Sequence, residues 1–413
     1  RRLAAKDIKA HSSAKIFPGI SPAGTPSIKR SVKVDTSIVG WHSLGLFADA
    51  GQMIHVHLPP TAVGKKIKVR MGSTTCKLWN KSVWNRAPEI TNEWPLTQPE
   101  TKIASSFGGL IYIVVTEATH DGSITVTIDG AVESPYYKLG QTSLQDWVQR
   151  VRYLPAPWAE LASDKVILTV PATEVRELDN PKLLMQTWDR VLDLSADLAV
   201  LPKTRDYPQR YCADVQLCAG WMHAGNPIMI PSVTAKNLVA SNHLINEGNW
   251  GFYHETGHMF QNPDWTFEGT GEVTVNLFTM YILDKLCNIK PEVGRMAQPN
   301  IERQYRAYFK EGSQFEQWKS NPFLALYMYY QLQQEFGWEA FKNVFAQYHE
   351  LSPGQRPKND QEKRDQWMVR FSKVVKQNLG PFFQLWGIPI SESLQESVSN
   401  LPIWLPIGFP PKE

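Results

Sequence analysis

Hydrophobic and polar residues alternate along the first third of the chain. The alternation is clearest in the segments SIKRSVKVDTS, GQMIHVHLP, KIKVRMGS, GGLIYIVVTE and GSITVTIDG, which are separated by turn residues. A period of two is typical of strands with one buried face, and many short strands separated by turns are typical of a sandwich or jelly roll. We therefore predict a β-sandwich module over residues 26–132. Its expected function is packing support, with sugar binding as the alternative.

The pattern changes after this module. DKVILTVP is predicted to be a strand, and DNPKLLMQTWDRVLDLSADLAVL an amphipathic helix that Asn180 or Asp179 caps and Pro181 begins. YCADVQLCAGWMHAGNPIMI is predicted to be extended strand and loop. Its place in the chain makes it the candidate edge strand for main-chain pairing with a substrate.

Helical periodicity dominates beyond residue 270, for example in FLALYMYYQLQQEF, WEAFKNVFAQY and WMVRFSKVVKQNLGPFFQLWG. The whole chain is therefore predicted to be α+β, with the β-sandwich followed by a mainly helical catalytic domain with a small mixed sheet over residues 133–398. Residues 1–25 are predicted to be a lead-in or linker, and residues 399–413 a Pro-rich tail.

The short segment HETGH carries the candidate chemistry. His254 and His258 are four residues apart, so in a helix they share one face and can bind one metal ion. Glu255 lies about 100° around the helix and can act as a general base on a metal-polarised water without being a ligand. The alternative is an ordinary core helix with two histidines. A catalytic zinc also needs a third protein ligand.

The segment EGTGEVTVNLF is predicted to supply that ligand. Gly269-Thr270-Gly271 breaks the chain, and Thr270 is expected to cap a second helix. Glu272 is predicted to be the third ligand, and Asn276, one turn later, to orient a ligand side chain by a hydrogen bond. Glu268 is the rival third ligand, but it precedes the helix in a Gly-rich loop.

HETGH and WTFEGTGEVTVNLF resemble the gluzincin metallopeptidases of the enhancin and accessory-mucinase type, peptidase family M60. Further stretches that resemble this family extend over roughly residues 26–390, and include VDTSIVGWHSLGLFADAGQ, DVQLCAGWMHAGNPIM and NPFLALYMYYQLQQEFGWEAF. The resemblance implies one Zn²⁺ per chain, held by His254, His258 and Glu272, with Glu255 as the catalytic base. It also implies a secreted, periplasmic or cell-surface protein.

The resemblance implies hydrolysis of mucin-type O-glycosylated proteins, in a manner that depends on the glycan. A zinc peptidase without a glycan requirement and a non-enzymatic glycan- or partner-binding protein are the alternatives, because vertebrate relatives include ion-channel-associated factors. Asn249, Trp250 and Gly251, just before the motif, are predicted substrate contacts, as is His223. Tyr327, Tyr329 and Tyr330 are candidates for stabilising the oxyanion.

Composition narrows the remaining possibilities. The chain has 413 residues and a net charge of +3, from 43 basic and 40 acidic residues, so no nucleic-acid partner is expected. No apolar run approaches the roughly 18 residues of a membrane-spanning helix. A monomer is expected, and the lack of an initiator methionine and of an apolar signal core suggests a cut or processed chain.

The chain has four cysteines and no CxxC pair. Cys212 and Cys218 share strand parity, but they would need a hairpin to approach each other. Free, partly buried thiols are therefore predicted for these two and for Cys76 and Cys287.

Overall fold

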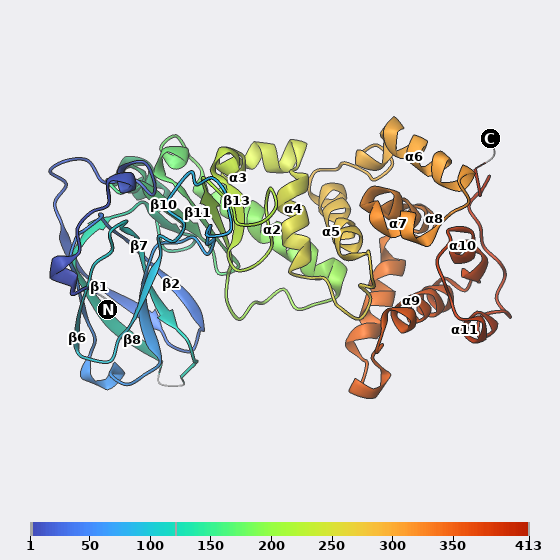
Figure 1. The fold of residues 1–413 in the computed structure, drawn as a ribbon, viewed down its shortest axis with the longest axis horizontal. Coiled ribbons are helices and arrows are strands. Elements are labelled where there is room, and N and C mark those ends of the chain that lie inside the picture. The colour runs from blue at the N-terminus through green and yellow to red at the C-terminus, as the bar shows by residue number, and fades with distance from the viewer. Residues whose placement is uncertain (1–2, 120–121, 412–413) are drawn as a thin grey trace. The chain divides into compact units, whose positions relative to one another are not determined.

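The computed structural model describes residues 3–119 and 122–411 (Figure 1). The chain divides into two compact units. The N-terminal unit holds Arg1–Asp189 and Thr204–Leu244, and the helical unit holds Arg190–Lys203 and Ile245–Glu413. The first two residues of the predicted lead-in and the last two of the predicted tail lie outside the described residues.

An antiparallel sheet of eight strands forms the first part of the N-terminal unit (Figure 1). Its strands are β1 (Ile28–Asp35), β2 (Gly40–Ala48), β3 (Ile54–His57), β4 (Ile67–Met71), β5 (Asn92–Pro95), β6 (Glu100–Ile103), β7 (Gly109–Val115) and β8 (Ser123–Glu133). They pair in the order β5-β4-β7-β2-β8-β3-β6, and β1 also pairs with β8. Strand β8 contacts β1, β2 and β3, so it joins the two halves of the sheet.

One hydrophobic core lies inside this sheet. Along β8, Ile124, Val126 and Ile128 are buried in that core, while Ser123 and Thr125 are exposed. This is the alternation that the sequence predicts, and burying each such side chain contributes about 1.5–3 kcal/mol. Together with the helices described below, it confirms the predicted α+β class.

A second sheet of five strands completes the N-terminal unit. Its strands are β9 (Tyr136–Lys138), β10 (Trp158–Ala162), β11 (Val166–Pro171), β12 (Gln209–Asp214) and β13 (Ile228–Pro231), in the order β13-β12-β11-β10-β9. Only β10 and β11 pair antiparallel; the other neighbours are parallel. The predicted edge segment therefore contributes β12 and the edge strand β13. However, the backbone of Met229 in β13 also pairs with His223, which covers part of that edge.

Three helices accompany the five-stranded sheet: α1 (Leu144–Gln149), α2 (Pro181–Ala199) and α3 (Ala235–Leu238). Of the two predicted caps of α2, Asn180 is the one that acts, because its side chain accepts the backbone N–H of Leu183 at 3.0 Å. Asp179 instead pairs with Arg152.

The predicted lead-in is packed against the N-terminal unit and does not behave as a free linker. The ring of Phe17 lies edge-on to Trp158 at 5.7 Å, and the indole N–H of Trp158 donates to the carbonyl of Pro18. The backbone N–H of Ser21 donates to Asp49.

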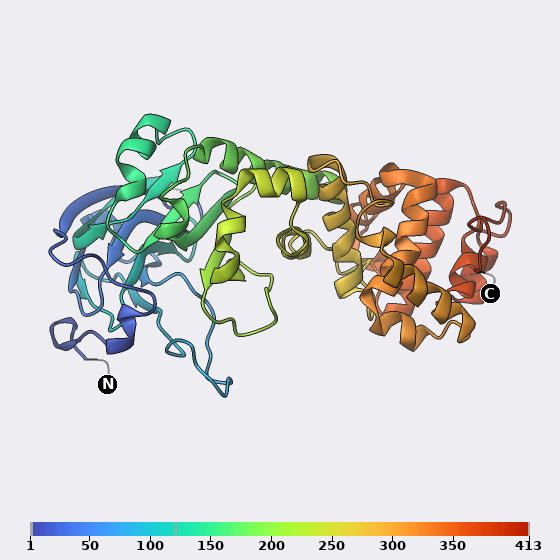
Figure 2. The ribbon, with the colours of Figure 1, turned by 90° about the horizontal axis from the view of Figure 1, so that it is seen from above.

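The helical unit contains eight α-helices among its described residues (Figure 2, yellow to red). They are α4 (Trp250–His258), α5 (Gly271–Leu286), α6 (Pro299–Lys310), α7 (Phe315–Ser320), α8 (Pro322–His349), α9 (Asp360–Val375), α10 (Gly380–Leu385) and α11 (Glu392–Glu396). Inside α8, Gly337 has a φ of 69°, which kinks the helix between the two predicted helical stretches.

Aromatic side chains fill the core of the helical unit. Trp265 stacks on Phe345 with ring centroids 4.1 Å apart, and Phe345 also contacts Trp367 of α9. The Pro-rich tail joins this packing, because Trp404 lies against Phe336 and its neighbour in the tail, Ile403, forms a β-bridge with Asn378.

The prediction of four free thiols is wrong for two of the cysteines. Cys76 and Cys218 form a disulfide across 142 residues, whereas Cys212 and Cys287 are not disulfide-bonded. Strand parity in the sequence compares only cysteines within one segment. It could not predict this bond, because Cys76 lies in the β4–β5 connection and Cys218 in the β12–β13 connection. The hairpin alternative of Cys212 with Cys218 does not form.

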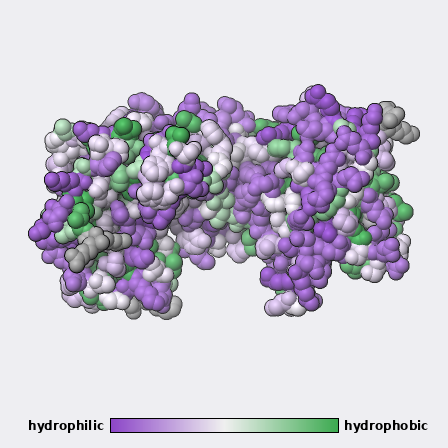
Figure 3. Space-filling view, viewed as in Figure 1, coloured by the Kyte–Doolittle hydropathy of each residue, from purple (hydrophilic) through white to green (hydrophobic). Residues whose placement is uncertain are grey.

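The face of the molecule in Figure 3 is mainly hydrophilic, with scattered hydrophobic residues. None of the helices in the described part of the chain has the length and apolar character needed to span a bilayer.

Candidate metal centre and active site

Helix α4 presents the two histidines of HETGH. Asn249 begins the helix, because its side chain accepts the backbone N–H of Phe252 at 3.0 Å. The helix ends at His258. Because His254 and His258 are four residues apart within this helix, they lie one turn apart on the same face.

Helix α5 packs closely against α4, and Gly257 permits this. A Cβ atom at Gly257 would lie 2.9 Å from the carbonyl oxygen of Val275 and 3.0 Å from Cβ of Phe278. The contact places the first turn of α5, with Glu272, beside the histidines.

Three ligand-type atoms converge at this contact. Nε2 of His254 lies 2.9 Å from Oε2 of Glu272 and 3.1 Å from Nε2 of His258, and the third separation, from His258 to Glu272, is 3.7 Å. Tetrahedral zinc with bonds of about 2.0–2.2 Å to nitrogen and oxygen places its ligand atoms about 3.3–3.5 Å apart. The triangle therefore has the dimensions of one face of a zinc coordination tetrahedron.

Amide side chains fix the tautomer of both imidazoles. Asn276 donates its side-chain N–H to the carbonyl of Glu272, so its oxygen faces Nδ1 of His254 at 2.8 Å. Gln261 donates to the carbonyl of Gly271, so its oxygen faces Nδ1 of His258 at 2.7 Å. Each Nδ1 therefore carries a proton and donates it, which leaves each Nε2 lone pair directed into the triangle.

Gln261 is the residue that sequence reasoning missed. It lies three positions after His258, beyond the end of α4, and it also donates to the hydroxyl of Thr274 at 2.8 Å. The sequence shows only that an amide side chain lies three residues after a predicted ligand. It does not show in which direction the chain turns there.

The charges of the triangle favour a bound cation. Hydrogen bonds with His254 and His258 hold the pKa of Glu272 well below its usual range. Burial disfavours the charged form of His258, but its hydrogen bonds with Glu272 and Gln261 outweigh this effect and raise its pKa. Two imidazole lone pairs and a carboxylate repel one another unless a proton or a metal ion lies between them.

Access to the triangle is asymmetric. The side chains of His254 and His258 are only 16% and 20% exposed, while that of Glu272 is 63% exposed. Glu255, next to His254 on α4, is buried. An ion in the triangle would have protein on one side and an open coordination position on the other, as a catalytic site requires.

Glu268, the rival ligand, is engaged elsewhere. Its carboxylate pairs with Lys319 at 2.6 Å, and its backbone N–H donates to Asp360. Thr270 does precede α5 as predicted, but its hydroxyl donates to the carbonyl of Phe267 and makes no cap. The expected side-chain cap is therefore wrong, and Glu272 supplies a favourable charge in the first turn instead.

The predicted substrate contacts before the motif have structural partners. Trp250 lies 5.7 Å from the ring of Phe323, and the guanidinium of Arg295 lies 5.0 Å above the indole. Asn249 caps α4, and Gly251 is half-buried in the first turn. His223 belongs to the N-terminal unit, where its ring faces the Cys76–Cys218 disulfide.

The candidate oxyanion tyrosines lie on α8. Tyr329 is fully buried beside Trp367, and burial raises its pKa, so its hydroxyl has no route to a substrate. Tyr327 is half-buried and stacks on Tyr305, while burial raises the pKa of half-buried Tyr330 to about 12. Tyr327 and Tyr330 therefore stay predictions for oxyanion stabilisation. Among the contacts of the described residues, none joins either tyrosine to His254 or His258.

The donor set, its tautomers and the neighbouring glutamate are those of a metallopeptidase of the HExxH type with a distal glutamate. Comparison with known proteins shows the family to which the chain belongs. Residues 130–387 match the family described as peptidase M60, enhancin and enhancin-like, and residues 24–129 match the N-terminal domain of M60-like peptidases. The chain belongs to the M60 peptidase family.

Curated relatives of the chain carry other names. It is 38% identical to human TRPM8 channel-associated factor 1 over 88% of this chain and 39% of that protein. It is 36% identical to the homologue from Danio rerio over 88% of this chain and 40% of that one. The chain thus spans about two fifths of the length of the curated relatives it matches.

Solved structures share the fold at low identity. A functionally unknown conserved protein from Bacillus anthracis gives a TM-score of 0.72 at 23% identity, covering 91% of this chain and 80% of that one. The ZmpB metallopeptidase from Clostridium perfringens gives 0.68 at 17% identity over the same shares. The M60 catalytic domain of ZmpC from C. perfringens, in complex with the sialyl T antigen, gives 0.66 at 16%, again over 91% and 80%.

Proposed function

We propose that the chain is a zinc-dependent endopeptidase that cleaves mucin-type O-glycosylated proteins. The observation that carries the proposal is the convergence of His254, His258 and Glu272 on one point, with both histidines oriented by amide side chains. Membership of the M60 family supports peptidase chemistry. The ZmpC structure in complex with the sialyl T antigen supports a glycoprotein as the substrate class.

The geometry of the triangle supports the ligand and orienting roles that we propose. His254, His258 and Glu272 hold the ion, and Asn276 and Gln261 keep the two imidazoles in the ligand tautomer. Zn²⁺ bound there would supply Lewis acidity toward a water molecule and the scissile carbonyl. The carboxylate of Glu255 accepts a proton from the attacking water and returns it to the leaving amine.

Two alternatives come from other observations. A zinc peptidase without a glycan requirement fits the same site, because the contacts of Trp250 are with Phe323 and Arg295. A partner-binding protein without turnover fits the 38% identity to a TRPM8 channel-associated factor, which exceeds the identity to the clostridial peptidases.

The deciding experiment compares cleavage of an O-glycosylated mucin peptide and its bare counterpart, with zinc content measured on the same protein. We expect the glycopeptide alone to be cut, and a chelator or Glu255→Gln to abolish the cutting. Glu268→Gln is the matched control, because this glutamate pairs with Lys319, and it should retain activity.

The outcomes separate the three functions. Equal cutting of both peptides would establish the chemistry and reject glycan dependence. A zinc-loaded protein that cuts neither peptide would reject the proposed activity and favour the binding protein. In that case Glu255→Gln would leave partner binding unchanged.

A further inference from the structure

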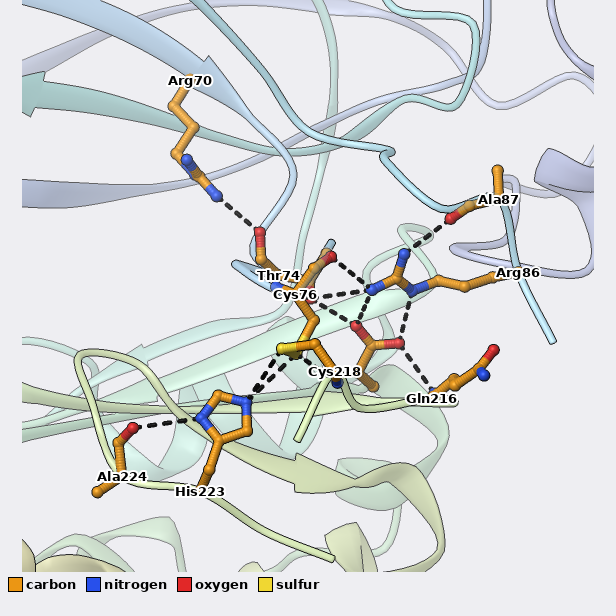
Figure 4. The surroundings of a disulfide bond; sticks show 10 residues. Arg70, Thr74, Cys76, Arg86, Ala87, Gln216, Cys218, His223 and Ala224 are labelled. Carbon is orange, nitrogen blue, oxygen red and sulfur yellow. Dashed lines mark hydrogen bonds and ion pairs between the residues drawn. A yellow bond between two sulfur atoms is a disulfide. The ribbon is translucent and has the colours of Figure 1, made fainter. Parts of the chain in front are cut away.

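A second cluster of metal-ligand side chains lies in the N-terminal unit. Cys76 comes from the β4–β5 connection, and Cys218 and His223 come from the β12–β13 connection. Their sulfur and nitrogen atoms lie within 4.8 Å of one another. Figure 4 shows the His223 ring pointing at the disulfide that Cys76 forms with Cys218. Neither the family assignment nor the proposed peptidase chemistry uses this cluster.

The orientation of His223 is that of a ligand. Its Nδ1 lies 3.2 Å from the carbonyl oxygen of Ala224, so this nitrogen carries the proton and donates it (Figure 4). Two backbone hydrogen bonds with Met229, of 3.2 and 3.0 Å, fix the residue against β13. The lone pair of Nε2 is thereby directed at the sulfur atoms, and metal-binding histidines are usually held in this way.

The distances from nitrogen to sulfur in this cluster also match the separations between two ligands of one zinc ion. Nε2 of His223 lies 3.3 Å from Sγ of Cys76 and 3.5 Å from Sγ of Cys218. Zinc bonds of about 2.0 Å to nitrogen and 2.3 Å to sulfur separate tetrahedral ligands by about 3.5 Å for N to S and 3.8 Å for S to S. Nε2 of His223 therefore already lies at about the required distance from each sulfur atom. Only the distance between the two sulfur atoms has to increase, which requires that the disulfide be broken.

The surroundings stabilise negative charge on sulfur. The backbone N–H of Cys218 donates to Sγ of Cys76 at 3.0 Å. The guanidinium of Arg86 donates to the carbonyl of Cys76 at 3.0 Å (Figure 4), which fixes the backbone of this cysteine, and the charge of Arg86 is paired with Asp214. A hydrogen bond donated to a cysteine sulfur favours the thiolate, which is the form that binds metals.

We propose that Cys76, Cys218 and His223 form a redox-gated zinc site, which the disulfide closes and reduction opens. A small-molecule thiolate attacks Sγ of half-buried Cys218, the S–S bond breaks, and Cys76 leaves as a thiolate. A second thiol releases Cys218 and forms the oxidised small-molecule disulfide. Zn²⁺ would then be held by two thiolates and one imidazole, with release of the thiol protons.

Metal counting on the full chain tests this proposal. The protein is oxidised or reduced, the reductant being a phosphine because dithiols compete for zinc. After equilibration with Zn²⁺ and gel filtration, zinc per chain is measured. We expect the reduced protein to hold one more zinc than the oxidised protein. Thiol titration in denaturant should show two more thiols after reduction.

Cobalt distinguishes this site from the histidine–glutamate triangle, because only thiolate ligands give a sulfur-to-cobalt charge-transfer band. The band should appear with Co²⁺ in reduced wild type and in reduced His254→Ala. Cys76→Ser and Cys218→Ser should abolish it, and His223→Ala should weaken cobalt affinity about tenfold or more. Cys287→Ser is the matched control, since Cys287 is a cysteine of the helical unit outside the disulfide, and it should keep the band.

Two results would overturn the proposal. If reduced wild type, with four titrated thiols, shows no additional zinc and no thiolate band, the cluster is a structural disulfide only. If the oxidised protein binds as much metal as the reduced protein, or is isolated with no disulfide under oxidising conditions, the redox gate is rejected. Each variant's melting temperature shows whether a lost band reflects unfolding.

Discussion

The side-chain oxygen of Asn276 lies 2.8 Å from Nδ1 of His254, and its amide nitrogen donates to the carbonyl of Glu272. One side chain of α5 therefore orients a ligand on α4 and contacts the backbone of a second ligand. We expect Asn276→Ala to weaken zinc affinity about 10–100-fold, because His254 loses its preferred tautomer. Competition with a chromophoric chelator measures this. An unchanged affinity would contradict the role assigned to Asn276. Gln317→Ala, which removes an exposed hydrogen bond between α7 and Glu311, is the control that should leave zinc affinity unchanged.

Substitutions of Gln261 can separate its contribution to zinc affinity from its contribution to stability. Its oxygen accepts from His258, and its nitrogen donates to Gly271 and Thr274. Gln261→Ala should lower both zinc affinity and melting temperature. Gln261→Glu keeps the acceptor for His258 but loses both donors, so zinc affinity should remain within about tenfold of wild type while the melting temperature falls. Equal losses of affinity in both variants would show that the oxygen is not what matters.

Gly257 is predicted to tolerate no side chain. Gly257→Ala places a Cβ atom 2.9 Å from the carbonyl of Val275, so α4 and α5 must separate. We expect a loss of about 1–3 kcal/mol in the free energy of unfolding, as for overpacked cores, together with weaker zinc binding. Denaturant unfolding and zinc titration measure the two effects.

Gly271→Ala is the matched control for this substitution. A Cβ atom there meets no atom within 4 Å, and Gly271 lies at the first position of α5. Replacing a helical glycine by alanine without a clash should stabilise slightly or have no effect. Equal destabilisation by both substitutions would argue against steric contact as the cause.

Asp284, in the last turns of α5, is expected to make the free energy of unfolding depend on pH. Burial favours its neutral form, but hydrogen bonds from Lys290 and Lys285 outweigh this effect and hold its pKa below the usual range. Its carboxylate also accepts the indole N–H of Trp338 at 2.9 Å. Because the folded-state pKa is depressed, the carboxylate stabilises the fold above the unfolded-state pKa of about 3.9, and this stabilisation is lost as pH falls through the folded-state value.

We therefore expect Asp284→Asn to lower the free energy of unfolding at pH 7 by about 1–3 kcal/mol, with a difference that shrinks below about pH 4. Urea unfolding of both proteins across this pH range is the measurement. A difference that stays constant with pH would show that packing, and not charge, accounts for the effect. Glu316→Gln, an exposed surface residue, should change little.

The local pattern of hydrophobic and polar residues was sufficient to predict many of the helices and strands. The alternation in β8 and the helical period of α2, α5 and α8 are properties of neighbouring residues, and these elements lie where the sequence predicts them. The spacing of His254 and His258 likewise fixes their common face. Glu272 was reachable because it begins the next helix after the motif.

Other features depend on contacts that sequence spacing does not encode. The Cys76–Cys218 bond joins two connections 142 residues apart. Gln261 lies near His258 in sequence, but its role depends on how the chain turns after α4 toward Gly271. Asn249 is predicted to contact substrate, and the structure adds a role that the prediction did not include, because its side chain caps α4. In each case the deciding partner is a backbone group or side chain whose position only the folded chain defines.

The contact at Gly257 also bears on which ions the triangle accepts. Since Gly257 lets α4 approach the carbonyl of Val275, the main-chain positions that carry the histidines and Glu272 lie at a short separation. A calcium ion needs six to eight oxygen ligands at about 2.3–2.6 Å, whereas the triangle offers two imidazole nitrogens and one carboxylate. The close packing of two helices thus brings together a donor set that suits zinc and does not suit calcium.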